Sequence, residues 1–282
     1  MPKELVRGIH GTFAIDPQKE RKLYKQMKEY GAHQRNELAM LLSFIKEGDV
    51  VVDVGAHIGL FSLAFSTTVG PLGKVYAFEP LPETFSTLLE NIKTNGALNI
   101  EPVQEVVGGL NEKVSAIIPQ YAHSGASFSK VSFESTTEAI TSISLDKFIK
   151  KIPVKESINL IKIDTEGMEY DVLLGAEETL SKHCPILYFE VNTRQTKSFF
   201  KTAIKTELFL RRFGYTFFKN LKERNSDTDV YEIGKVPILL FGGRFGDILA
   251  IPKGHALYPK KYSGAMVTFS MIIKRKIKKL FK

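Results

Sequence analysis

Short apolar runs and helical apolar patterns alternate along most of the chain. Apolar residues spaced three and four apart predict helices from about residue 60, over 82–95 and over 197–213. Because strand and helix alternate, the pattern predicts an α/β fold, with a doubly wound, mostly parallel sheet covered by helices on both faces. The runs that predict buried strands cover 50–54, 74–78, 101–107, 160–163 and 186–191.

Three segments depart from this alternation. Residues 17–45 predict two helices ahead of the first strand, and the alternating apolar positions of about 110–145 predict a β-hairpin insertion. The patterns at 215–218 and 247–251 predict an antiparallel hairpin that closes one edge of the sheet. We therefore divide the chain into an N-terminal helical segment (1–48), a main domain (49–255) and a C-terminal tail (256–282).

Composition restricts the classes of protein that fit this pattern. The chain has 282 residues, enough for one large domain, with 43% hydrophobic residues and one cysteine, Cys184. A single cysteine excludes an internal disulfide framework and a cysteine-rich metal cluster. The sequence shows neither the apolar core of a signal peptide nor a run of about 18 apolar residues, so we expect a cytoplasmic protein.

The net charge of +8 is concentrated at the C-terminal end. The last nine residues, KRKIKKLFK, carry six Lys or Arg, which leaves +2 for the rest of the chain and argues against a nucleic-acid groove along the whole protein. From Met266 onward, apolar residues fall on one helical face, which predicts a basic amphipathic helix. Such a helix contacts the inner face of an anionic membrane, docks on its own domain or remains a solvated tail.

One strand turns on two glycines into a helix, in the stretch VVDVGAHIGLFSL. Asp53 closes the strand, and Gly55 and Gly59 form a turn whose small residues and helix N-terminus suit a nucleotide ligand. The glycine fingerprint of dinucleotide sites is incomplete, because His57 and Leu60 stand at its second and third glycine positions. A ligand without phosphates fits such a turn better.

An acid stands at the end of the following strand. Glu79, in VYAFEP, has the spacing expected of a residue that binds the two hydroxyls of an adenosine ribose. The alternative is that Asp53 and Glu79 only cap helices and end strands. The combination of both acids with the glycine turn favours a ligand site.

The order of several motifs resembles the FkbM family of S-adenosylmethionine-dependent methyltransferases. The motifs are GDVVVDVGAHIGLFSL, YAFEP with NIKTN downstream, LIKIDTEGMEYDVLLGAEETL and PILYFEVN, all between about Glu37 and Asn192. The resemblance implies a class I methyltransferase domain, a Rossmann-like sheet of seven strands with the last one antiparallel. It also implies that S-adenosylmethionine binds at the ends of the first two strands.

The same resemblance implies roles for individual residues. Glu79 would bind the ribose hydroxyls, with Pro80 and Leu81 flanking the adenine. His57 stands where the family often has Asn and is a candidate for the active site. The residues that would line the methionine and ribose are Asp53, Gly55, Ala56, His57 and Gly59.

A second acidic cluster, in IKIDTEGME, follows the strand predicted at 160–163. The carboxyl ends of strands in open α/β sheets bind ligands, so Asp164 or Glu166 is a candidate to orient an acceptor hydroxyl and accept its proton. Together with His57, these are our candidate catalytic residues. In the alternative interpretation Asp164 caps a helix, and Glu166 and Glu169 only stabilise its dipole.

The resemblance implies an O-methyltransferase that uses S-adenosylmethionine and acts on a hydroxyl. The cytoplasmic prediction, the polar insertion and the basic tail favour a sugar of a surface polysaccharide or glycolipid as the acceptor. A methyltransferase for a small natural product, an NAD-dependent oxidoreductase and a non-catalytic, membrane-docked binding module are the alternatives. We assign no metal site, although a divalent metal held by Asp164 with Glu190 or Asn192 is a further option.

Overall fold

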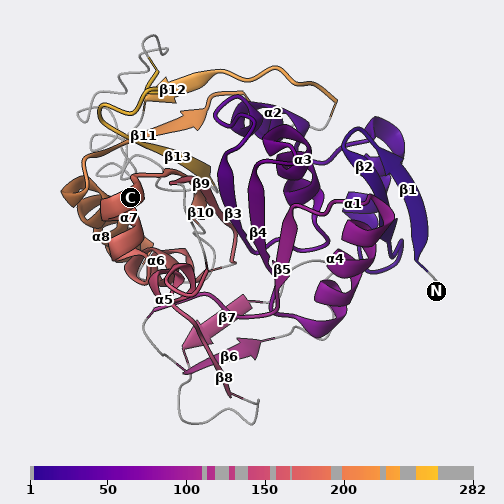
Figure 1. The fold of residues 1–282 in the computed structure, drawn as a ribbon, viewed down its shortest axis with the longest axis horizontal. Coiled ribbons are helices and arrows are strands. Elements are labelled where there is room, and N and C mark those ends of the chain that lie inside the picture. The colour runs from indigo at the N-terminus through magenta and orange to yellow at the C-terminus, as the bar shows by residue number, and fades with distance from the viewer. Residues whose placement is uncertain are drawn as a thin grey trace, which may run out of the picture.

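The main feature of the computed structural model is a central twisted sheet with helices on both faces (Figure 1). In the described part of the chain this sheet has eight strands in the order β12-β11-β13-β10-β9-β3-β4-β5. The strands are β3 (Val50–Val54), β4 (Lys74–Phe78), β5 (Ile100–Val103), β9 (Ile158–Ile163), β10 (Ile186–Val191), β11 (Tyr215–Asn220), β12 (Ile233–Lys235) and β13 (Gly246–Pro252). The described residues are 3–109, 113–117, 127–130, 139–152, 157–165, 167–191, 199–222, 227–235 and 246–259.

The direction of the strands confirms the Rossmann-like architecture. The strands β5, β4, β3, β9 and β10 pair in parallel, whereas β13 pairs antiparallel with both β10 and β11. Seven strands thus have the arrangement that the family resemblance implies. The short β12 adds an eighth strand, so the predicted hairpin of β11 and β13 does not itself form the sheet edge.

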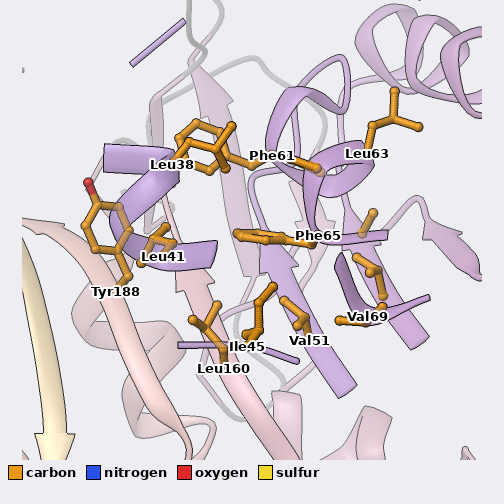
Figure 2. Packing of buried hydrophobic residues seen from close by; sticks show 14 of the residues in the cluster. Leu38, Leu41, Ile45, Val51, Phe61, Leu63, Phe65, Val69, Leu160 and Tyr188 are labelled. Carbon is orange, nitrogen blue, oxygen red and sulfur yellow. The ribbon is translucent and has the colours of Figure 1, made fainter. Parts of the chain in front are cut away.

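Two hydrophobic layers hold helices against the sheet. Alternate residues of β3 serve the two layers, Val51 on one face and Val52 on the other. Figure 2 shows the first layer, where Phe61 and Phe65 of α3 pack above Val51 and beside Leu38 and Leu41 of α2. The helices of this layer are α1 (Arg21–Tyr30), α2 (Arg35–Leu42), α3 (Leu60–Val69) and α4 (Pro82–Thr94); those of the second are α5 (Leu145–Ile149), α6 (Glu169–Leu174), α7 (Glu177–His183) and α8 (Phe199–Arg212).

The N-terminal segment contains more than the two predicted helices. A β-hairpin of β1 (Glu4–Gly8) and β2 (Gly11–Ile15) precedes α1 and lies beside α4 (Figure 1). Asn95 holds the hairpin in this position. Its side-chain oxygen accepts a hydrogen bond from the N–H of Thr12, and its side-chain N–H donates to the carbonyl of Thr12. The sequence interpretation missed this hairpin because its strands are short and only partly apolar.

The insertion is also different from the expected hairpin. It forms a separate antiparallel sheet of three described strands in the order β7-β6-β8, below the main sheet in Figure 1. The predicted amphipathic tail lies largely outside the described residues, which end at 259. Among the described helices, none is long and apolar enough to span a bilayer. The three strands are β6 (Lys113–Ile117), β7 (Ser127–Lys130) and β8 (Ala139–Thr141).

Candidate functional site

The turn between β3 and α3 depends on two glycines with left-handed backbone. Gly55 has a φ of 79° and Gly59 a φ of 91°. A Cβ on Gly55 would lie 1.9 Å from the backbone oxygen of Asp164, and one on Gly59 would lie 2.7 Å from Cδ1 of Leu88. Gly55 is therefore required by packing on the Asp164 backbone as well as by its φ, whereas Gly59 is required mainly by its φ. Both reasons are independent of ligand clearance.

This turn presents the N-terminus of α3 at the carboxyl edge of the sheet. Gly59 is the N-cap residue of α3, and no side chain of the described residues caps it. The N–H groups of the first turn and the helix dipole favour a polar or anionic group there. Gly55 and Ala56 both donate their N–H groups to the carbonyl of Phe78, which fixes the turn against the end of β4.

Glu79 directly follows β4 and faces this turn. Its side chain is buried; Oε2 accepts the N–H of His57 at 3.0 Å and Oε1 accepts the N–H of Leu81 at 3.0 Å. Burial raises the pKa of Glu79, and the hydrogen bonds from Leu81 and His57 oppose this rise. Because a carboxylate oxygen can accept two hydrogen bonds, each oxygen of Glu79 keeps capacity for a hydroxyl of a ligand. Pro80 and Leu81 beside it are half-buried.

His57 has a left-handed backbone, with a φ of 53°, although it carries a side chain. Its Nε2 lies 3.0 Å from Oε1 of Glu20, and 36% of its side chain is exposed. Burial lowers the pKa of His57, but Glu20, and then Glu79 and Asp164, raise it, so that the pKa lies above its ordinary value. His57 is thus bound by two acids, with Glu20 at its imidazole and Glu79 at its backbone N–H.

A buried ion pair lies beneath the turn. Asp53 is fully buried, and its carboxylate accepts hydrogen bonds from Nζ of Lys162 at 3.0 Å and from Oγ of Ser62 at 2.6 Å. The two charged residues are register partners on β3 and β9, so their side chains leave the sheet on the same face. The ammonium of Lys162 also donates to the carbonyl of Gly55 at 3.3 Å and lies 3.8 Å from the Asp164 carboxylate.

This geometry makes Lys162 a bridge between the glycine turn and the second acidic cluster. Burial lowers the pKa of Lys162, whereas Asp53 and Asp164 raise it, and the result lies above the ordinary value. The side chain is therefore an ammonium ion. Its charge is compensated by Asp53 inside the protein and by Asp164 toward the site.

The second acidic cluster divides into an exposed and a buried acid. Asp164 follows β9, and 42% of its side chain is exposed, so it is available to a ligand. Glu169, at the start of α6, is buried, and its Oε1 accepts hydrogen bonds from both the N–H and the hydroxyl of Thr165 and from the N–H of Gly167. Burial raises the pKa of Glu169 to about 7. Glu169 therefore organises the loop, whereas the candidate Glu166 lies outside the described residues.

The structure brings His57 and Glu79 together, because the N–H of His57 donates to Oε2 of Glu79 at 3.0 Å. Asp164 lies against the same turn, because its backbone oxygen would be 1.9 Å from a Cβ on Gly55. Asp53, expected to line the ligand, is fully buried and holds the turn from below. Sequence reasoning missed Lys162, although a lysine between isoleucines in an apolar strand signals a buried charge that needs a partner. It also missed Ser62 and Glu20, and Glu20 has no local signal because its partner is 37 residues away.

The residues at the turn fit S-adenosylmethionine. The carboxylate of Glu79 suits the ribose hydroxyls, and the uncapped end of α3 suits the methionine carboxylate. For a metal there is less support. The described residues contain no group of three His, Cys, Asp or Glu that could hold an ion, and Asn192 lies outside them.

Comparisons with known proteins identify a family that this part of the chain resembles. A family described as "Methyltransferase FkbM domain" matches residues 53–217, which includes the glycine turn, Glu79 and Asp164. A hexuronic acid methyltransferase, AglP, of Haloferax volcanii is 31% identical over 147 residues, which are 52% of this chain and 58% of that protein. "Methyltransferase 1" of Beauveria bassiana is 28% identical over 149 residues, 45% of this chain and 58% of that protein.

The chain therefore spans about 58% of the length of these curated relatives. Among solved structures, a methyltransferase FkbM from Methylobacillus flagellatus is similar with a TM-score of 0.44 and 16% identity. That similarity covers 73% of this chain and 44% of the other.

Proposed function

Because the chain belongs to the FkbM family of S-adenosylmethionine-dependent methyltransferases, we propose that it transfers a methyl group from S-adenosylmethionine to a hydroxyl of a carbohydrate. One observation carries the proposal. Asp164, a partly exposed carboxylate, contacts the glycine turn through its backbone and Lys162 through its side chain. An acceptor hydroxyl bound at Asp164 would thus lie next to the end of β3, where the cofactor is expected.

For methyl transfer, the protein has to orient the acceptor hydroxyl and accept its proton. When bound, S-adenosylmethionine would supply an electrophilic methyl group. The C–S bond would break as the acceptor oxygen forms the new C–O bond, and the sulfonium would become a neutral thioether. Asp164 orients the acceptor hydroxyl and accepts its proton, which it then passes to solvent. Glu79 holds the ribose, and Lys162 keeps Asp164 next to the turn. Among the residues predicted as catalytic, Asp164 therefore has the clearest role.

The acceptor class rests on the relative from Haloferax volcanii, which is described as acting on a hexuronic acid. A sugar of a surface polysaccharide or glycolipid fits this chemistry, since polar side chains at the carboxyl edge can bind several hydroxyls. A cytoplasmic location near the membrane stays a prediction from the sequence. No role for a metal is included.

Incubation with isotopically labelled S-adenosylmethionine and a panel of acceptors tests the proposal. The panel should hold nucleotide sugars, uronic acids and glycolipid precursors, with hydroxylated small molecules as the comparison class. We expect label on a sugar oxygen, and Asp164→Asn should lower turnover at least tenfold while affinity for S-adenosylhomocysteine changes less than twofold. Label only on non-sugar compounds would contradict the acceptor class, and a fully active Asp164→Asn variant would leave Asp164 a structural role.

A further inference from the structure

The N-terminal segment reaches the cofactor turn through one side chain. Glu20, at the N-cap position of α1, places Oε1 3.0 Å from Nε2 of His57. Only 17% of the Glu20 side chain is exposed. This residue lies outside the matched family domain, which begins at residue 53. The contact therefore joins a segment outside the matched family domain to the turn inside it.

The contact acts on a strained backbone. A residue with a side chain resists the left-handed region, and such a conformation persists only where surrounding contacts fix it. His57 adopts it with a φ of 53°, and in this conformation its N–H points at Oε2 of Glu79. Glu20 holds the other end of the residue, the imidazole ring. The chain Glu20–His57–Glu79 thus connects the N-terminal segment to the proposed ribose acid.

Glu20 is itself held in place by the docking of the hairpin on α4. Asn91 of α4 accepts the N–H of Ala14 at 2.7 Å and donates to the carbonyl of Ile58 at 2.8 Å. One buried side chain therefore links β2 to the residue next to His57. Lys19, adjacent to Glu20, pairs with Glu83 at the start of α4. These contacts hold the segment that precedes Glu20 beside α4 and the turn.

We propose that Glu20 is a positioning residue of the cofactor site, which holds His57 in its left-handed conformation and thereby aims Glu79 at the ribose of the adenosyl ligand. The inference rests on the proposed function, because it assigns Glu79 to the ribose. It makes the N-terminal segment a part of the cofactor site.

Calorimetric titration with S-adenosylhomocysteine tests this without knowledge of the acceptor. Glu20→Ala should weaken binding about fivefold, because the strained turn loses its outer anchor. Glu20→Gln keeps an oxygen that can accept from His57 and should recover part of this loss. Glu90→Gln is the matched control: it breaks the exposed Lys3–Glu90 pair between the same segment and α4, and should leave affinity unchanged.

A double-mutant cycle separates positioning from a general effect on folding. Asn adopts left-handed backbone more readily than other residues with side chains, so His57→Asn should keep the turn without the link to Glu20. In that background Glu20→Ala should have no further effect on affinity. Equal weakening in both backgrounds, or unchanged affinity of Glu20→Ala in the wild-type background, would overturn the inference. Failure of the wild-type protein to bind S-adenosylhomocysteine would instead overturn the proposed function.

Discussion

The two halves of the site are built differently. In the half where we propose that the cofactor binds (the cofactor half), at the ends of β3 and β4, polar groups are held by backbone donors or buried partners. Glu79 is held by two N–H groups, and Asp53 by Lys162 and Ser62. In the half where we propose that the acceptor binds (the acceptor half), at the end of β9, 42% of the Asp164 side chain is exposed, and its carboxylate lies 3.8 Å from Nζ of Lys162.

This difference in exposure and hydrogen bonding matches the different ligands that we propose for the two halves. A ligand that is the same in every reaction is matched by a site whose geometry is fixed before binding. The acceptor half offers an exposed carboxylate on a loop, which can serve different hydroxyls. Lys162 contacts both halves, so its replacement should disturb the site most.

Replacement of Lys162 by Met should destabilise the protein by about 4 kcal/mol, because it leaves Asp53 as a buried charge without its counterion. Chemical denaturation measures this change in the free energy of unfolding. The double variant Lys162→Met with Asp53→Asn removes both charges and should recover most of the loss. A single variant as stable as the wild-type protein would show that the pair does not hold the two halves together.

Replacement of Gly55 by Ala should cost about 3 kcal/mol, because the new Cβ meets the Asp164 carbonyl in a residue with a φ of 79°. Gly48→Ala is the matched control, since Gly48 has a φ of 85° but nothing within 4 Å of its added Cβ. That variant should lose only the backbone part, about 1 kcal/mol. Equal losses for the two variants would contradict the close packing of the turn on β9.

Replacement of Glu169 by Gln should have a smaller effect that depends on pH. The folded-state pKa of about 7 lies above the ordinary value of 4.5, so the wild-type carboxyl favours folding below pH 4.5 and loses this contribution as pH rises through 7. Gln keeps the acceptor oxygen without ionising. The stability of the variant relative to wild type should therefore rise by about 2 kcal/mol between pH 5 and 7. If the difference in free energy of unfolding between the variant and the wild-type protein is the same at both pH values, Glu169 is not a buried carboxyl with a raised pKa.

Much of the fold could be predicted from the sequence because it is coded locally. The strands 50–54, 74–78 and 186–191 are observed at the predicted residues, and α4 ends one residue earlier than predicted. Buried parallel strands give continuous apolar runs, and the helices between them carry the helical period. The N-terminal hairpin and the third strand of the insertion lack such runs and were missed.

Only those residues of the site that stand in short sequence motifs could be predicted from the sequence. Glu79 and the two glycines of the turn stand in such motifs, so the sequence could predict that they lie at the same edge of the sheet. The partner of Asp53 is 109 residues away and the partner of His57 is 37 residues away. Such pairs depend on strand register and on docking of the N-terminal segment, which no local pattern encodes. The sequence indicates that Gly55 leaves space for a ligand. In the structure, a Cβ on Gly55 would also meet the backbone of Asp164, and this contact between distant residues has no local signal.

Binding of adenosyl ligands tests the central claim most directly, namely that the cofactor half is built for S-adenosylmethionine with Glu79 on the ribose. Calorimetry should compare S-adenosylhomocysteine, S-adenosylmethionine and NADH on the wild-type protein and on Glu79→Ala. The account predicts saturable binding of the two adenosyl compounds but not of NADH, and affinity at least tenfold weaker for Glu79→Ala. Unchanged affinity of that variant, or binding of NADH alone, would contradict it.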